Sequence, residues 1–193
     1  MSDPLDAVDW PVRTERLVIR RATADDAEAL WRHRRLPEVT MWITNGPSDL
    51  EDFRAHLVQP ERLATTLVIE LVEPGGPLVI GDVMLRVEDG WAQREVAELA
   101  RGTEAELGWT LHPGHSGRGY ATEAVRAVIA TCFGALGLRR VHAGCFAANE
   151  PSWRLMERVG MEREEFSRKT GLHRSGVWMD GMHYGVLAED WTG

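Results

Sequence analysis

The stretch LHPGHSGRGYATEA, which runs from Leu111 to Ala124, decides the fold. It has the pattern of a strand end, a glycine-rich loop and the first turn of a helix. Small residues in such a loop let the backbone approach an anion, and the free N–H groups of the first helical turn add the positive end of the helix dipole. The pattern therefore predicts a binding site for phosphate or pyrophosphate.

Two better-known phosphate loops do not fit this stretch. A Walker A loop needs Gly-Lys-Ser or Gly-Lys-Thr, which does not occur in the chain. The dinucleotide fingerprint G-x-G-x-x-G needs its third glycine where Thr122 stands. Taken alone, Gly117 and Gly119 are also compatible with a turn that binds nothing.

The helix after the loop carries the most regular pattern of the chain. Its apolar residues recur at helical spacing along one face: Ala121, Ala124, Val125, Val128, Ile129, Cys132, Phe133 and Leu136. Such a stripe predicts a helix packed on a sheet, and Gly137 is expected to end it.

Strands and helices are predicted on both sides of this helix. Upstream, strands are expected at 15–20, 63–72, 78–87 and 104–111, and helices at 23–35 and 48–58, the second capped by Ser48. Downstream, a strand at 140–146, a helix at 149–159 and strands at 161–168 and 177–188 follow. This order predicts an α/β (α+β) fold with a mixed, mostly antiparallel sheet of about seven strands and about four helices. Residues 1–12 are predicted to be an N-terminal tail and 13–193 one domain.

Composition excludes several classes of function. The 193 residues carry a formal net charge of -8, so neither nucleic acid nor an anionic membrane is an expected partner. No apolar run reaches the length of a membrane span, and Met1–Trp10 lacks the basic and apolar regions of a secretory signal. With only two cysteines, a cytoplasmic location is expected. The seven histidines are dispersed, so no metal site is expected.

Two motifs, in this order, resemble those of the GNAT acetyltransferase superfamily. Its acyl-CoA-binding motif, Gln/Arg-x-x-Gly-x-Gly/Ala, is similar to Ser116–Ala121, with Ser116 in place of the Gln or Arg. Its second motif, Asn-x-x-Ser…Leu-x-Glu-x-x-Gly-Phe/Met, is similar to Asn149–Met161. The opening Thr14–Arg20 and the closing Asp180–Trp191 resemble the RimJ/RimL-like branch.

This resemblance covers nearly the whole chain and implies a fold, an activity and a cofactor. The fold is a single GNAT-like domain whose sheet is splayed between its fourth and fifth strands, at 104–111 and 140–146. The activity is an N-acetyltransferase that transfers the acetyl group of acetyl-CoA directly to a primary amine, on a protein N-terminus or a small molecule, in a ternary complex. The implied cofactor-binding residues are Leu111, Ser116, Gly117, Arg118, Gly119, Tyr120, Ala121, Thr122, Asn149 and Ser152.

Direct transfer needs a group that accepts the proton of the amine and a donor for the departing thiolate. Ser152 matches the family's thiolate donor, although a first-turn serine also serves as a local helix partner. Glu106, which shares a strand face with Glu104, is the candidate base through water, or else an exposed edge carboxylate. Asn149 either binds pantetheine or caps its own helix. Cys145 is either inert or open to a mixed disulfide with CoA under oxidation.

The acceptor side has weaker signals. Trp31, Trp42 and Trp91 are candidate acceptor-binding residues by resemblance, and core or lid packing is the alternative. A non-catalytic acyl-CoA-binding module is the alternative function, because Ser116 departs from the motif and Met156 stands where many relatives carry a tyrosine acid. A homodimer is left open by analogy alone.

Overall fold

The computed structural model describes residues 3–193. Hydrogen bonds join eight strands in the order β1-β2-β3-β4-β5-β6-β8-β7. The chain divides into a first unit, Met1–Met84 with Trp109–Ala127, and a second unit, Leu85–Gly108 with Val128–Gly193. The strands β4 (Leu78–Glu88) and β5 (Glu104–Leu111) and the helix α5 (Tyr120–Gly134) contribute residues to both units.

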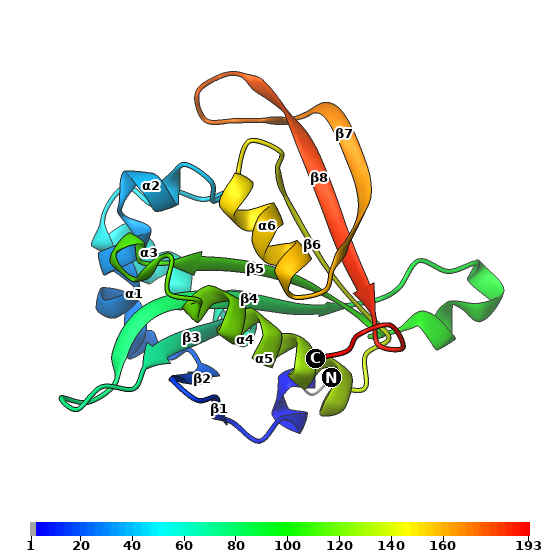
Figure 1. The fold of residues 1–193 in the computed structure, drawn as a ribbon, viewed down its shortest axis with the longest axis horizontal. Helices are drawn as coiled ribbons and strands as arrows, with labels where there is room; N and C mark the ends of the chain where they lie inside the picture. The colour runs from blue at the N-terminus through cyan, green and yellow to red at the C-terminus, as the bar shows by residue number, and fades with distance from the viewer. Residues whose placement is uncertain (1–2) are drawn as a thin grey trace. The chain divides into compact units, whose positions relative to one another are not determined.

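The first unit holds β1 to β3, parts of β4 and β5, and most of the helices (Figure 1). Its own strands are β1 (Val12–Arg13), β2 (Leu17–Arg21) and β3 (Thr66–Leu71). Its helices are η1 (Pro4–Ala7), η2 (Ala24–Asp26), α1 (Ala27–Arg34), α2 (Pro37–Thr40), α3 (Leu50–Leu57), α4 (Pro60–Thr65) and η4 (Pro113–His115), of which those labelled η are 3₁₀ helices. Neighbouring strands from β1 to β4 pair antiparallel, so the predicted hairpin of β3 and β4 is confirmed.

Helices α1 and α3 lie side by side and share one hydrophobic core with β3 (Figure 1). Its buried members are Ala22, Ala27, Leu30, Phe53, Leu57 and Val68. Trp31 is packed against this cluster and stacks on Phe53, with the ring centroids 5.8 Å apart. Apolar residues at helical spacing on α1 and α3 therefore cover one face of the sheet.

The predicted strand at 63–72 is wrong over its first three residues, because Pro60–Thr65 forms α4 and β3 begins at Thr66. Proline at the first helical position lacks an N–H that would have had no partner there, so Pro60 favours a helix start ahead of the β-branched run. Pro37 acts in the same way and begins α2.

The predicted cap of the 48–58 helix is one residue out. Asp49 is the residue that caps α3, and its carboxylate accepts a hydrogen bond from the Asp52 N–H at 2.9 Å. Ser48 instead donates its own N–H to the Asp52 carboxylate. Both residue types are good caps, and Asp49, with extended backbone directly before the helix, is the one whose side chain accepts from the first turn.

Part of the predicted N-terminal tail is packed. Met1 and Ser2 lie outside the described residues, but Pro4–Ala7 forms η1 and Leu5 is buried. The side chains of Asp3 and Asp6 are ion-paired with Arg21 on β2. At the end of this segment, β1 (Val12–Arg13) adds an eighth strand to the seven predicted.

The second unit is built around three antiparallel strands and a helix. Strand β6 (Arg140–Phe146) pairs with β8 (Trp178–Leu187), which pairs with β7 (Glu162–Leu172). Helix α6 (Glu150–Arg158) packs against these three strands (Figure 1). The 3₁₀ helix η3 (Arg94–Ala100) stands on the extended loop between β4 and β5.

Strands β5 and β6 pair in parallel over only three residues each. The partners are Glu104 with Arg140, Ala105 with Val141 and Glu106 with His142. The rest of β6 pairs with β8 alone. The predicted splay between these two strands is therefore confirmed.

Most of the predicted apolar stripe is buried on α5, while Ala121 and Phe133 are half-buried and Leu136 lies beyond the helix. Ala124, Val125, Val128, Ile129 and Cys132 are among the buried residues of the chain. The helix ends at Gly134, three residues before the predicted stop, and Gly137 has a φ of 63°. A left-handed residue just beyond the last turn is a usual way for a helix to end, and glycine adopts it without strain.

Candidate functional site

The glycine loop (residues 112–122), in the first unit, links the end of β5 to α5. After η4, Gly117 and Gly119 have φ values of 74° and 82°, which side chains with a Cβ rarely adopt. Residues 116–119 are exposed. The predicted loop thus has a backbone that requires glycine at both positions and a face open to solvent.

The first hydrogen bond of α5 runs from the Glu123 N–H to the Gly119 carbonyl, at 3.0 Å. The N–H groups of the residues just before Glu123 precede the helical ladder and have no intrahelical partner. They stand at the positive end of the helix dipole. Ser116–Thr122, all predicted to bind cofactor, therefore form one continuous run at a helix N-terminus, with Leu111 at the end of the preceding strand.

Two histidines line the start of the loop. The Nδ1 of His112 accepts a hydrogen bond from the Gly114 N–H at 3.0 Å and so closes η4. His115 lies between the rings of His112 and Tyr120, and its Nδ1 is buried with no partner among the described residues. Burial, with the nearby His112 and Arg118, lowers the pKa of His115. Neutral His115 adds no positive charge to the loop at pH 7.

A side-chain anchor holds the first turn of α5 to the turn between β1 and β2. Glu123 accepts hydrogen bonds from the Thr14 hydroxyl at 2.6 Å, the Arg16 N–H at 3.0 Å and the Arg16 Nε at 2.7 Å. The Nη1 of Arg16 also donates to the Arg118 carbonyl at 3.0 Å, inside the glycine loop. This anchor is not predicted from the sequence, where its one sign is an acidic residue in the first turn of an expected anion-binding helix.

In the second unit, Asn149 and Ser152 stand at the start of α6. Asn149 is the cap residue, yet its side chain makes no capping hydrogen bond, so the alternative in which it caps its own helix is not seen. The Asn149 carbonyl accepts from the Ser152 N–H at 3.1 Å. The amide side chain of Asn149 is left available to a ligand.

Ser152 lies next to Cys145 on β6. Burial raises the pKa of the Cys145 thiol to about 11, and a hydrogen bond with the Ser152 side chain lowers it in part. At neutral pH the thiol is therefore protonated and unreactive. Met156, one turn further along α6, is buried, and the hydroxyl of buried Tyr184 is bonded to Glu157 at 3.2 Å.

The candidate base Glu106 belongs to a charged face of the second unit. Its carboxylate is paired with Arg86, which also pairs with Glu88. Glu104, on the same strand face as predicted, is held by Arg139 and Arg140. Both carboxylates are thus ion-paired, and the Glu106 side chain keeps 30% of its surface exposed.

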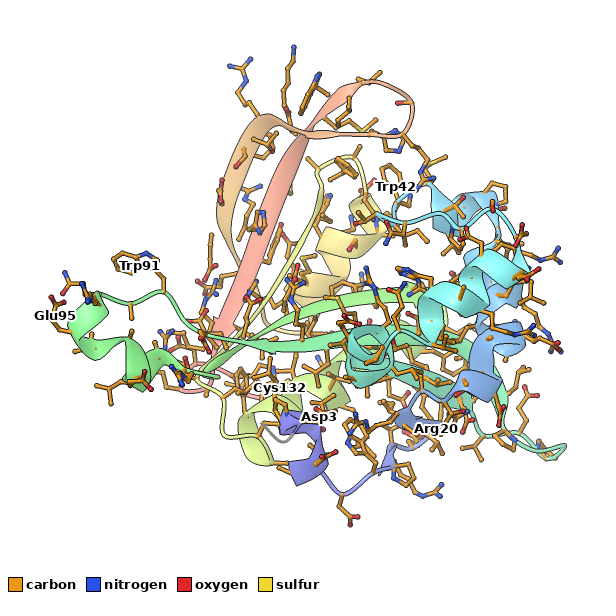
Figure 2. All side chains as sticks on the ribbon, turned by 180° about the vertical axis from the view of Figure 1, so that it is seen from behind. Asp3, Arg20, Trp42, Trp91, Glu95 and Cys132 are labelled. Atoms are coloured by element: carbon orange, nitrogen blue, oxygen red, sulfur yellow. The ribbon has the colours of Figure 1, made fainter. Side chains whose placement is uncertain are left out.

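The three candidate tryptophans differ in their surroundings. Trp31 belongs to the core described above, which is the packing alternative. Trp42, in the first unit, is half-buried in the segment after α2. Trp91 is 90% exposed and, with Glu95, stands on the extended loop of the second unit (Figure 2).

The first unit also contains a buried polar cluster that was not predicted from the sequence. The carboxylate of Asp82 on β4 accepts hydrogen bonds from Thr110 on β5 and from Arg34 on α1, and lies 2.9 Å from the Nε2 of His33. The side chains of Asp82 and His33 are each 1% exposed. The charges of such a cluster come from separate elements, so spacing along the sequence gives no sign of it.

Residues 3–193 contain no group of three or more acidic, histidine or cysteine side chains placed to hold a metal ion. None of their helices combines the length and the apolar character that crossing a membrane requires.

The chain is similar to known acetyltransferases. The model of the acetyltransferase (GNAT) domain matches residues 16–162, which is most of the sequence. The chain belongs to the GNAT acetyltransferase family. This GNAT protein is 29% identical over 182 residues to the uncharacterized N-acetyltransferase YnaD of Bacillus subtilis, covering 94% of this chain and 99% of YnaD.

Solved structures agree with the family. An acetyltransferase of the GNAT family from Bacillus anthracis matches with a TM-score of 0.77 at 28% identity, over 93% of this chain and 99% of that one. Mycobacterium smegmatis RimJ, solved in complex with CoA-disulfide, shares the fold with a TM-score of 0.70 at 22% identity, over 93% of this chain and 89% of its own. This GNAT protein is therefore an N-acetyltransferase, and the predicted α/β fold with a mixed, mostly antiparallel sheet is confirmed.

Proposed function

We propose that this acetyltransferase takes its acetyl group from acetyl-CoA and transfers it directly to a primary amine. The observation that carries the proposal is the glycine loop, where Gly117 and Gly119 hold left-handed backbone directly before the N-terminus of α5. Anions bind at such helix ends without a net positive charge on the protein. A chain with a net charge of -8 thus has a local place for the pyrophosphate of CoA.

The residues that would hold CoA fit its two chemical parts. Amides of residues 117–122 would bind the pyrophosphate, and Leu111 and Asn149 would bind the pantetheine arm. The side chain of Asn149 makes no capping hydrogen bond, which supports this role, because its amide donor and its carbonyl acceptor both remain available. Bound acetyl-CoA supplies an activated thioester.

Two further residues serve the transfer. The neutral amine attacks the thioester carbon, a C–N bond forms, the C–S bond breaks and one proton leaves the amine. Glu106, whose carboxylate is ion-paired with Arg86, accepts that proton through water. Ser152 donates a hydrogen bond to the departing thiolate. To do so, its hydroxyl gives up its hydrogen bond with Cys145.

The acceptor is proposed to be a primary amine on a protein N-terminus or a small molecule, in keeping with a RimJ/RimL-like branch. Acidic residues around the extended loop, among them Glu88, Asp89, Glu95 and Glu98, support a cationic acceptor. Trp42 and Trp91 are proposed to contribute to its binding. A cytoplasmic location is proposed because Cys132 and Cys145 are both free thiols.

Release of free thiol from acetyl-CoA tests this function, measured with a panel of N-terminal peptides and small amines. We expect turnover above the hydrolysis background with at least one class of amine. Gly119→Glu is the matched inactive control, because it places bulk and negative charge where Gly119 has a φ of 82°. CoA binding without turnover on any amine would instead favour the non-catalytic acyl-CoA-binding module.

A further inference from the structure

Glu123 presents an electrostatic problem at the proposed phosphate site. It lies in the first turn of α5, four residues after Gly119. A carboxylate there stabilises an isolated helix through the dipole, but it also repels an incoming phosphate and competes for the same free amides. A helix that binds an anion at its N-terminus should avoid a free carboxylate in its first turn.

The turn between β1 and β2 removes this problem. Arg16 donates to Glu123 through its backbone N–H and its Nε, and its Nη2 lies 2.6 Å from the Glu123 Oε2. Thr14 adds a fourth contact through its hydroxyl, at 2.6 Å from Oε1. These bonds occupy both carboxylate oxygens of Glu123, whose side chain is only 17% exposed.

The same guanidinium reaches the loop itself. Arg16 Nη1 donates to the Arg118 carbonyl, and its Cζ lies 4.7 Å from the centre of the Tyr120 ring. A Cβ added at Gly119 would lie 3.4 Å from Arg16 Nη2. Arg16 remains 41% exposed, so one cation stands beside the left-handed glycine and is open to solvent.

We infer that Arg16 is a positioning residue for the CoA site, which keeps the Glu123 carboxylate turned away from the phosphates and fixes the glycine loop through the Arg118 carbonyl. The inference rests on the proposed use of CoA and adds to it a residue outside the motif. Thr14 and Arg16 thereby join the β1–β2 turn to the cofactor site.

Variants that change the charge at Glu123 distinguish this role from one in which Arg16 only stabilises the fold. Arg16→Ala leaves the carboxylate uncompensated, and we expect the Kd for CoA to rise about tenfold at low salt, with a smaller rise as ionic strength increases. Adding Glu123→Gln to Arg16→Ala removes the repelling charge, and we expect the Kd to return to within about threefold of the wild-type value. Glu123→Gln alone keeps Arg16 and is expected to bind CoA at least as tightly as the wild type.

Calorimetric titration of CoA, with the Tm of each variant measured in parallel, checks this order of affinities. Arg16→Lys keeps the charge but loses the forked contacts with Glu123 and the Arg118 carbonyl, so its Kd for CoA is expected to lie between those of the wild type and Arg16→Ala. Pantetheine, which lacks phosphates, is expected to bind Arg16→Ala and the wild type equally. Arg54→Ala, which removes an exposed ion pair with Glu28 in the same unit, is the matched control and should leave the Kd for CoA unchanged.

Two results would overturn the inference while leaving the proposed function intact. One is a double variant that binds CoA no better than Arg16→Ala; the other is a pantetheine affinity that falls as much as that for CoA. Either result would mean that Arg16 only stabilises the fold. A wild-type chain that binds no CoA would overturn the proposed function itself, and the inference with it.

Discussion

Arg34 on α1 holds the buried carboxylate of Asp82 on β4, with its Nε 3.0 Å from the Asp82 Oδ1. Burial alone would raise the pKa of Asp82, but the charge of Arg34 and a hydrogen bond from His33 outweigh it, and the pKa lies well below its ordinary value. The first unit therefore carries a permanent charge in its interior, with Arg34 itself 23% exposed. Breaking this pair from one side leaves the other charge without a partner.

Asp82→Asn is expected to destabilise the protein by about 3 kcal/mol, because a half-broken buried ion pair leaves a charge poorly compensated. Urea unfolding followed by circular dichroism measures the change. Arg34→Met added to Asp82→Asn removes the second charge and should recover part of the loss. A single variant as stable as the wild type would show that the pair contributes nothing net.

Acid should destabilise the protein in a defined range of pH. Asp26, Asp82 and Glu123 all have pKa values below their ordinary ones, since hydrogen bonds and arginine charges overcome the effect of burial. Groups with lowered folded-state pKa values stabilise the fold above their unfolded values, about 4, and this contribution is lost as pH falls toward the folded values. The urea midpoint should therefore change little from pH 7 to 5 and fall below about pH 4.

Asp82→Asn supplies the comparison for that pH profile. Its midpoint starts lower but should fall less steeply below pH 4, because one of the three titrating groups is gone. An acid limb as steep as that of the wild type would assign the acid sensitivity to other carboxylates.

Elements marked by periodicity or a glycine stop were predictable from the sequence. The stripe from Ala124 to Cys132 gave α5, and the hairpin of β3 and β4 followed from two apolar runs around a turn. The start of α4 at Pro60 was missed because leucine and threonine fit a strand and a short helix alike. Packing decides such short segments, and single-sequence patterns do not contain it.

One part of the candidate site was predictable from the sequence and another part was not. The glycine loop was predictable because each of its parts, from strand end to helix start, is contiguous in sequence. The anchor of Glu123 was not, because Arg16 lies 107 residues away along the chain. The pairing of Arg86 with Glu106, 20 residues apart, was missed for the same reason, since spacing predicts which residues share a face and says nothing of a partner on the next strand.

Glu106→Gln is expected to lower kcat by about 100-fold, a usual contribution of a general base, while the Kd for CoA stays unchanged. The amide keeps the size of the side chain but neither accepts the proton nor pairs with the Arg86 charge. Thiol release at saturating acetyl-CoA, with the best amine of the panel, measures kcat.

Glu104→Gln is the matched control for this variant. Glu104 shares the strand face and is also ion-paired, through Arg139 and Arg140. Its replacement should leave kcat within about threefold, because only Glu106 is assigned the proton. Equal losses of kcat in both variants would point to the overall charge of this strand face and would argue against Glu106 as the base.

Ser152→Ala is expected to act on turnover and on Cys145 together. Loss of the hydroxyl removes the donor for the departing thiolate, so kcat should fall more than CoA affinity does. It also removes the hydrogen bond that lowers the pKa of Cys145, which then rises above about 11. Fewer thiolates at pH 9 mean slower alkylation by iodoacetamide, which mass spectrometry follows peptide by peptide.

Cys132 serves as the internal reference in that experiment, because burial raises its pKa to about 12 and it lies in the stripe of α5. Its alkylation should be negligible in both proteins while the fold is intact. Faster alkylation of Cys145 in Ser152→Ala, with Cys132 still protected, would mean that the hydroxyl shields the thiol and does not stabilise its thiolate. Unchanged kcat would separately show that another group donates to the leaving thiolate.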